Sequence, residues 1–462
     1  MKHYFAYILI IAIVATQVVF AQKQTPPPGG KPKDFTLPAR TGTTLPNGLK
    51  GTMVRYGEVP KVSIQVIIKT GNIHEGPNED WLADLTALMM KEGTKTSSAK
   101  EIAKKAAGMG GDVATTAGME QFIVSGTVLS EYAPAFIQLL ADIVMNPAFP
   151  PSELERLKQG LKRQAAVGKT VPQSIAVERF FTHFYKDHPY NLAFPTEEQL
   201  SSYKIEDVTR FYKEQFGAKR TTIYVAGKFD EKQVAEAIES SFSPWTEGPE
   251  VSYPPADVNE VAEIEIVDRP SAPQTTIMVG LPTLTPKDKD YIPFVVTNTL
   301  LGGAFGSRIT VNIREDKGYS YSPFSTLQNR QGNTIWYEQA DVTSEFTGAS
   351  LQEIAKEIKR LQDEKPSEKE LEGIKNYQAG IFVLQNSNPY GIINQLNFID
   401  RFGLPDSYLT DYVRNVHAIT SDDIQRLAKD QLRYDEMTIV LVGDKKLLEQ
   451  QIKADQRRLL VK

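Results

Sequence analysis

The sequence contains no cysteine and few histidines, which limits the crosslinks and metal sites that the protein can form. Without cysteine, neither a disulfide framework nor a thiolate metal site is possible, so a metal ion would need imidazole and carboxylate ligands. The five histidines are His3, His74, His183, His188 and His417. His183 and His188 are the nearest pair, and their spacing does not suit one face of a helix. The sequence therefore offers no histidine pair with the spacing of a metal site.

An excess of positive charge is also lacking. The chain has 52 lysines and arginines against 57 aspartates and glutamates, for a formal net charge of -5. Binding to nucleic acid needs a concentrated basic surface, so we exclude nucleic acid as a partner. No nucleophile-elbow, phosphate-loop or dinucleotide-binding motif stands in the right context. The composition, 41% hydrophobic and 24% charged, is that of a globular protein, and 462 residues predict two domains.

The one long apolar run lies at the start of the chain. Lys2 and His3 precede an apolar stretch from Tyr4 to Phe20, and Val19-Phe20-Ala21 resembles a small-residue cleavage site. We predict a signal peptide at residues 1–21 and an exported, periplasmic protein. An uncleaved membrane anchor is the alternative, because the run is long for a signal and short for a span. Residues 22–34 are rich in Pro, Gly and Lys and predict a linker.

An internal repeat organises the rest of the chain. Residues 207–227 align without a gap on residues 423–443, and each copy reads as a helix followed by an apolar strand. We predict an α+β fold with two homologous domains, each a mostly antiparallel sheet layered against helices. The domains are placed at residues 35–247 and 256–462, on either side of a proline-rich segment.

Local patterns place several elements in the first domain. Strands are predicted at 61–70 and 121–129, and helices at 80–92, 131–144 and 151–167. Gly93 is expected to close the first of these helices, and Ser97 or Ser98 to cap a further helix after it.

Residues 301–325 have the sequence pattern that is hardest to explain by core packing alone. A break at Gly302 and Gly303 is followed by a predicted helix over 305–315, a stop at Gly318 and an alternating strand from Tyr319. This pattern places the cation of Arg314, in the last helical turn, near the phenol of Tyr321. On spacing alone, ordinary packing is the more common explanation for each of the two residues.

The same stretch resembles the C-terminal signature of the insulinase-like (pitrilysin) family of zinc peptidases, in the short-subunit branch that includes mitochondrial processing peptidase. The resemblance extends from Phe35 to the C-terminus and implies the same tandem domains. In that family an arginine and a tyrosine at this spacing lie across the cleft from zinc, where they bind the substrate backbone and the developing oxyanion. Arg314 and Tyr321 match those positions. Gly302 and Gly303 would border the cleft and contact substrate.

Active members of the family carry H-x-x-E-H on the first long helix and a further glutamate ligand on a later helix. The corresponding segment here is WLADLTALMMKEGT. On that register Asp84 and Leu88 occupy the two histidine positions, and Ala87 occupies the position of the catalytic glutamate. Gln164 occupies the position of the distal ligand. We therefore predict that this chain binds no catalytic zinc.

The resemblance implies a non-catalytic, substrate-binding subunit of an exported heteromeric zinc metallopeptidase. A homologous partner subunit would carry the zinc and the general base, this chain alone would have no activity, and homodimers are also possible. The substrate would be a peptide or an unfolded protein. The alternative is a structural or peptide-binding relative with no part in catalysis.

Overall fold

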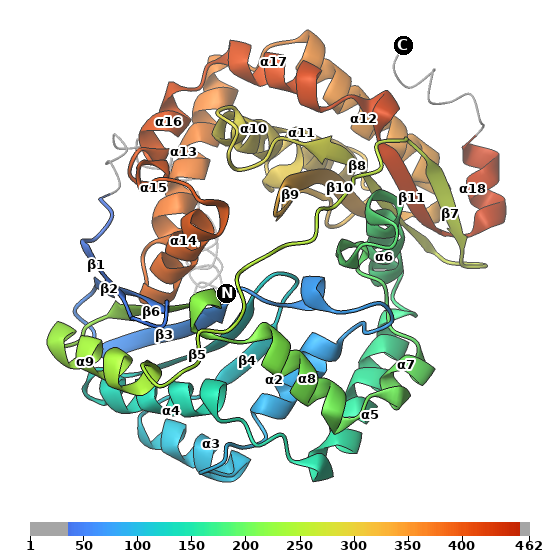
Figure 1. The fold of residues 1–462 in the computed structure, drawn as a ribbon. Helices are drawn as coiled ribbons and strands as arrows, with labels where there is room; N and C mark the ends of the chain where they lie inside the picture. The colour runs from blue at the N-terminus through green and yellow to red at the C-terminus, as the bar shows by residue number, and fades with distance from the viewer. Residues whose placement is uncertain (1–35, 453–462) are drawn as a thin grey trace, which may run out of the picture. The chain divides into compact units, whose positions relative to one another are not determined.

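The computed structural model describes residues 36–452 (Figure 1). The predicted signal peptide at 1–21 and linker at 22–34 therefore lie outside the described residues. Within the described range, no helix combines the length and the apolar character needed to cross a membrane.

The first half of the chain builds a six-stranded sheet in the order β1-β2-β6-β3-β5-β4. Its strands are β1 (Arg40–Thr44), β2 (Lys50–Arg55), β3 (Lys61–Ile68), β4 (Ala114–Ala117), β5 (Phe122–Leu129) and β6 (Thr221–Gly227). β2 and β6 run parallel, and every other neighbouring pair is antiparallel.

The second half builds a five-stranded sheet in the order β7-β11-β8-β10-β9. Its strands are β7 (Ile264–Asp268), β8 (Gln274–Thr283), β9 (Phe324–Arg330), β10 (Asn333–Thr343) and β11 (Thr438–Gly443). Again one pair, β7 and β11, is parallel and the rest are antiparallel. The two sheets share one topology apart from β1, so the predicted α+β fold with two homologous sheets is confirmed.

The first half contains eight α-helices among the described residues. They are α2 (Leu82–Met90), α3 (Ala99–Gly108), α4 (Ala133–Met145), α5 (Pro151–Gly168), α6 (Pro172–Tyr185), α7 (Glu197–Ser202), α8 (Ile205–Gln215) and α9 (Glu231–Phe242). Ser98 caps α3 as predicted, because its side chain accepts from the backbone N–H of Glu101 and the Glu101 carboxylate accepts from that of Ser98. The predicted helix over 80–92 is shorter than expected, since Trp81 has a left-handed φ of 65° directly before α2.

The second half contains α-helices and two π-helical runs. They are α10 (Tyr291–Asn298), the π-helix η5 (Thr299–Gly303), α11 (Arg308–Thr310), the π-helix η6 (Val311–Asp316), α12 (Thr347–Asp363), α13 (Glu368–Gln385), α14 (Pro389–Phe402), α15 (Ser407–Thr410), α16 (Tyr412–Ala418), α17 (Ser421–Gln431) and α18 (Lys445–Gln451). The aligned copies of the repeat are α8 with β6 and α17 with β11, each a helix followed by a strand as predicted.

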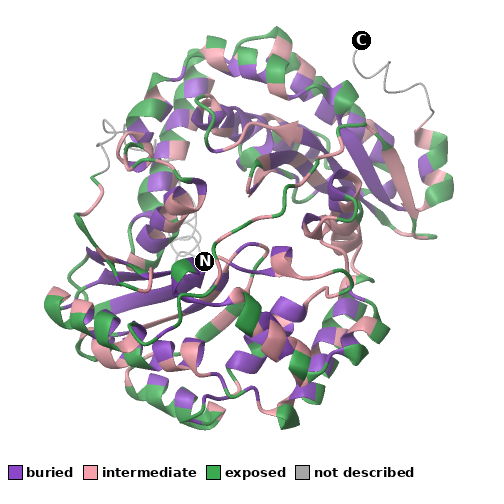
Figure 2. Cartoon of the chain, in the orientation of Figure 1, coloured by how far each residue is buried: buried purple, intermediate pink, exposed green. Residues whose placement is uncertain are grey.

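The two halves exchange helices. α6 of the first half packs on β8 and β11 of the second sheet, and α14 of the second half packs on β3 and β6 of the first (Figure 1). One hydrophobic cluster accordingly joins Ile67 and Tyr224 of the first sheet to Leu396 of α14. Figure 2 shows that the strands of both sheets are largely buried. Each half therefore needs the other to cover its sheet.

A buried carboxylate reinforces this junction. Glu120 of the first half is 2% exposed and accepts from the Tyr190 hydroxyl at 2.6 Å, the Gln331 backbone N–H at 2.8 Å and Nε of Arg401 at 2.7 Å. Arg401 and Gln331 belong to the second half, so one side chain ties the two halves together.

The prediction for residues 305–325 was wrong in two places. The helix begins at Arg308, not Phe305, and is π-helical from Val311 onward. Tyr319 does not start a strand: only Ser320 forms an isolated bridge, with Val342, and β9 begins at Phe324. Pro323 directly before β9 has no N–H to donate to a ladder, which explains why the pairing starts after it.

Candidate functional site

Arg314 and Tyr321 lie together, as the sequence predicted. Cζ of Arg314 is 4.9 Å from the centroid of the Tyr321 ring and 4.2 Å from that of the Phe305 ring. Nε of Arg314 is also 3.2 Å from Oε1 of Glu315. Tyr321 is 77% exposed, so a ligand can approach its hydroxyl. The planar guanidinium of Arg314 can donate hydrogen bonds to a carbonyl oxygen, and the hydroxyl of Tyr321 beside it can donate another.

Phe305 is a third member of this group that the sequence reasoning missed. It follows the glycine pair in the loop before α11 and is 65% exposed. Cation–π attraction to an aromatic ring contributes about 0.5–1 kcal/mol at an exposed site, so rings of Phe305 and Tyr321 together restrain the Arg314 guanidinium. An exposed aromatic beside a pair of glycines is the signal that could have identified it.

The two glycines differ in their surroundings. Gly302 is buried, and a Cβ built on it would lie 2.5 Å from both Oε2 of Glu338 and Oγ of Ser325. Gly303 is exposed, and its Cβ would lie 2.6 Å from Nδ2 of Asn298. Close packing thus explains glycine at both positions, and contact between either glycine and a substrate stays a prediction.

Glu338 on β10 is completely buried beneath Gly302. Neither of its carboxyl oxygens has a hydrogen-bond partner among residues 36–452. Burial raises the pKa of Glu338 well above its usual value, because an isolated carboxylate is costly to remove from water. Burial therefore favours the protonated, neutral form of this side chain. No sequence signal distinguished it from the other glutamates.

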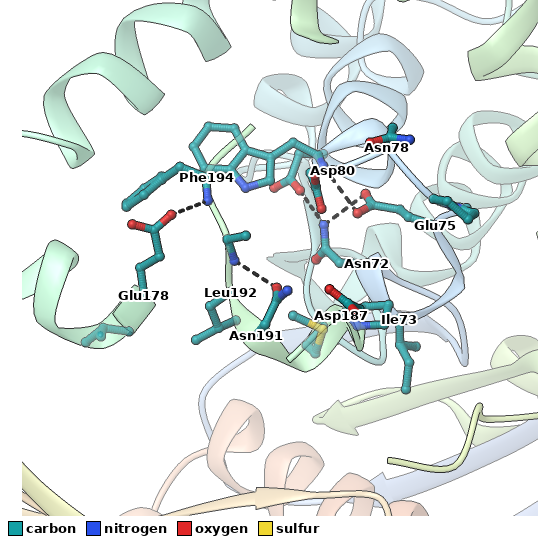
Figure 3. A pocket seen from close by; sticks show the side chains of 18 of the residues that line it. Asn72, Ile73, Glu75, Asn78, Asp80, Glu178, Asp187, Asn191, Leu192 and Phe194 are labelled. Atoms are coloured by element: carbon teal, nitrogen blue, oxygen red, sulfur yellow. Dashed lines mark hydrogen bonds between the residues drawn. The ribbon is translucent and has the colours of Figure 1, made fainter. Parts of the chain in front are cut away.

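Two of the three degenerate zinc-ligand positions meet at one cavity in the first half. Asp84 of α2 and Gln164 of α5 both line a cavity of about 730 Å³, which we call the Asp84 cavity. Figure 3 shows this cavity, with Asn72, Glu75 and Asp80 among the labelled side chains. Ala87 is buried and Leu88 is exposed at the protein surface, and neither lines the cavity. The register taken from the sequence therefore brings the first and the distal ligand positions to one cavity, and the other two motif positions lie outside it.

Asn72 and Glu75 organise the acidic wall of this cavity. Nδ2 of Asn72 donates to Oδ2 of Asp84 at 2.7 Å and to Oε1 of Glu75 at 3.1 Å. Glu75 also accepts from the backbone N–H groups of Trp81 and Ala83 at the start of α2. Burial raises the pKa values of Glu75 and Asp84. No sequence motif distinguished Glu75 from other acidic residues, so this role was not predicted.

These residues do not fit a zinc ion. At the expected ligand positions Asp84 offers one carboxylate, Gln164 offers an amide and Leu88 offers no donor, whereas zinc sites use three or four nitrogen, sulfur or carboxylate ligands. No group of three or more His, Cys, Asp or Glu side chains in the described part of the chain is arranged to hold a metal ion.

Comparison with known proteins gives consistent matches over most of the chain. Residues 54–195 match the family model described as insulinase, peptidase family M16, and residues 202–377 match the one described as the peptidase M16 inactive domain. An uncharacterized zinc protease of Rickettsia bellii is 25% identical over 69% of this chain and 77% of its own length. The uncharacterized zinc protease YmxG of Bacillus subtilis is 24% identical over 87% of this chain and 97% of its own length.

Solved structures share the fold. A peptidase M16 inactive domain from Pseudomonas fluorescens has a TM-score of 0.80 at 24% identity, covering 88% of this chain and 98% of that one. A protease from Helicobacter pylori has a TM-score of 0.81 at 18% identity, covering 88% and 100%. A chain of complex III2 from Candida albicans has a TM-score of 0.74 at 17% identity, covering 91% and 99%.

Proposed function

Because this chain belongs to the insulinase-like peptidase family, family M16, and lacks its zinc-binding motif, we propose that it is the non-catalytic, substrate-binding subunit of an exported heteromeric zinc metallopeptidase. A homologous partner subunit would hold the zinc ion. The substrate would be a peptide or an unfolded protein segment.

The proximity of Arg314 to Tyr321 is the observation that carries this proposal. The Arg314 guanidinium would hold a backbone carbonyl of the peptide, and the Tyr321 hydroxyl would donate to the oxyanion that develops at the scissile carbonyl. Zinc in the partner would polarise that carbonyl and activate water. A purely structural subunit has no need of an exposed tyrosine hydroxyl beside a partly exposed arginine at this spacing.

Two further features support a peptide substrate. β4 and β9 are edge strands of their sheets, and an edge strand can pair with an extended peptide through main-chain hydrogen bonds. The relatives from Rickettsia bellii and Bacillus subtilis are described as zinc proteases.

The experiment is reconstitution with a zinc-bearing homologue from the same organism, followed by cleavage of a fluorogenic peptide. Tyr321→Phe keeps the ring and removes the donor, so turnover should fall by roughly a hundred- to a thousand-fold. Assembly, measured by size-exclusion chromatography, should be unchanged. Tyr319→Phe is the matched control, because the Tyr319 ring stacks on Phe346 at 4.6 Å and that stack survives loss of the hydroxyl.

Equal turnover of wild type and Tyr321→Phe in the assembled enzyme would contradict the role of the hydroxyl. If no zinc-bearing homologue gains activity from this chain, the alternative of a structural or peptide-binding relative replaces the proposal.

A further inference from the structure

We propose that Asn312 is a positioning residue: its side chain fixes η6 on α12 and thereby holds the Arg314 guanidinium beside Tyr321. The consequence for peptide cleavage rests on the proposed function. The fixing of η6 concerns this chain alone and needs neither a partner subunit nor a substrate.

The amide of Asn312 is buried between η6 and α12. Asn312 and Glu357 are 8% and 4% exposed. Nδ2 of Asn312 donates to Oε1 of Glu357 at 2.8 Å and to Oε2 of Glu353 at 2.9 Å. An asparagine amide nitrogen has two N–H donors, so both are used. Oδ1 of Asn312 has no hydrogen-bond partner within residues 36–452, so the polar attachment of this side chain depends on those two donors.

The two acceptors would repel each other without a donor between them. Glu353 and Glu357 are four residues apart on α12, so they lie on the same side of the helix, where like charges are destabilising. Partial burial acts to raise the pKa of Glu353, but hydrogen bonds from Asn312 and Lys356 bring that pKa below its usual value. Hydrogen bonds to an ionised acceptor are the stronger ones. The amide of Asn312 therefore offsets the repulsion and ties η6 to α12.

Arg314 follows Asn312 by two residues in the same short helix. Asn312 is buried, whereas the Arg314 side chain is 24% exposed at the candidate site. η6 is a π-helical run of six residues, and such runs are rare and frequent at functional sites. The Lys317 backbone N–H closes it by donating to the Asn312 carbonyl at 3.0 Å. A shift of so short a segment would move Arg314 with it, so the anchoring of Asn312 sets the direction of the guanidinium.

Tyr321 is held by a different element. Oγ of Ser320, the residue before it, donates to the backbone carbonyl of Asp341 at 2.8 Å, and Ser320 also forms a bridge with Val342 of β10. Arg314 is thus anchored on α12, and Tyr321 is anchored on β10. Loss of the Asn312 hydrogen bonds should displace Arg314 and leave Tyr321 in place.

Hydrogen exchange measured on the full chain, without a partner, tests the fixing of η6. Asn312→Asp removes both donors and adds a third carboxylate, so the amides of residues 313–318 should exchange at least about tenfold faster than in wild type. The strands of the first sheet should keep their wild-type rates, because the opening is local. Asn376→Asp, an exposed amide on α13, is the matched control and should not change exchange at 313–318. Equal exchange of this segment in wild type and Asn312→Asp overturns the proposal.

A swap of the two groups provides the rescue. In the double variant Asn312→Asp/Glu357→Gln, the amide on α12 can donate to the carboxylate on η6, so exchange at 313–318 should return to within about threefold of wild type. A double variant that exchanges as fast as Asn312→Asp overturns the amide–carboxylate pairing. If Asn312→Asp does not fold, Asn312→Ser keeps one donor and should show a smaller increase in the same direction.

Kinetics of the reconstituted enzyme test the effect on Arg314. Asn312→Asp should raise KM for a peptide at least about fivefold and change kcat less than about twofold, the pattern of weakened substrate binding. The double variant should restore KM. Unchanged KM, or a fall in kcat as large as the rise in KM, overturns the positioning of Arg314. If the wild-type chain activates no zinc-bearing homologue, the proposed function fails, and the exchange measurement still decides whether Asn312 fixes η6.

Discussion

Glu338 shows how strongly burial acts on one side chain. Its carboxyl group is enclosed between Gly302 and the second sheet without a hydrogen-bond partner in the described chain, and the raised pKa follows from the loss of hydration. Such a group makes the stability of the fold depend on pH.

The sign of this dependence follows from proton binding. An unfolded glutamate ionises near pH 4.3, by approximate reference value, whereas folded Glu338 keeps its proton to a much higher pH. In that window folding takes up a proton, so the free energy of unfolding falls as pH rises, by about 1.4 kcal/mol per pH unit. Glu338→Gln stays neutral, so its stability relative to wild type should increase as the pH is raised above the unfolded pKa of glutamate.

Urea denaturation of both proteins at a series of pH values checks this prediction. Glu345→Gln, an exposed acid in the same half, should show no such gain. A constant difference between wild type and Glu338→Gln across the pH range would mean that Glu338 ionises normally in the folded protein.

Phe305 should act on substrate binding through Arg314. Phe305→Ala removes the ring whose centroid lies 4.2 Å from Cζ of Arg314. The Arg314 side chain then has more conformational freedom, and substrate binding must restrict it at an entropic cost. In the reconstituted enzyme we expect KM to rise about threefold to fivefold, corresponding to the loss of one cation–π contact. Thermal stability should hardly change, because the ring is largely exposed.

Phe346→Ala is the matched control, since Phe346 is also an exposed aromatic but stacks on Tyr319 instead. Steady-state kinetics with one peptide substrate compare the variants. If the two substitutions change KM equally, Phe305 has no special relation to Arg314.

At the scale of elements, the end of η5 depends on the absence of a side chain. Gly302→Ala would place a methyl group 2.5 Å from Oε2 of Glu338 and from Oγ of Ser325. Overpacking of this kind costs about 1–3 kcal/mol. We expect the free energy of unfolding, measured by urea denaturation, to fall by that amount.

Gly306→Ala supplies the comparison within the same segment, because nothing lies within 4 Å of a Cβ at Gly306. Its stability should be close to that of wild type. A Gly302→Ala protein that is equally stable would show that η5 can shift away from β10 without cost.

At the scale of the whole molecule, the exchange of α6 and α14 makes the halves interdependent. Glu120→Ala should cost about 3–5 kcal/mol, because it leaves Arg401 and Tyr190 without their buried partner. Asp290→Asn, which disturbs the more exposed pair with Arg426 inside the second half, should cost less than about 1 kcal/mol.

Urea denaturation followed by tryptophan fluorescence reports on both halves, since Trp245 and Trp336 lie one in each. We expect wild type to unfold in a single transition. A Glu120→Ala protein as stable as wild type would show that the helix exchange alone joins the halves.

Local sequence determined the elements and the chemistry that depends on spacing along the chain. The helix-strand repeat, the Ser98 cap and the proximity of Arg314 and Tyr321 were all predictable, because hydrophobic period, capping and short separations act between neighbours in sequence. The assignment of Asp84 and Gln164 to degenerate zinc-ligand positions depended instead on the resemblance to the insulinase-like family.

Tertiary structure alone decided which helix covers which sheet, the Asp84 cavity and the burial of Glu338. These features arise from contacts between residues far apart in the chain, such as Glu120 with Arg401, where periodicity carries no information about the partner. The sequence pattern around a glutamate on an alternating strand is the same whether its side chain is exposed to solvent or buried under a helix. Glu338 is buried because segments distant in sequence, among them Gly302 of η5, pack over β10.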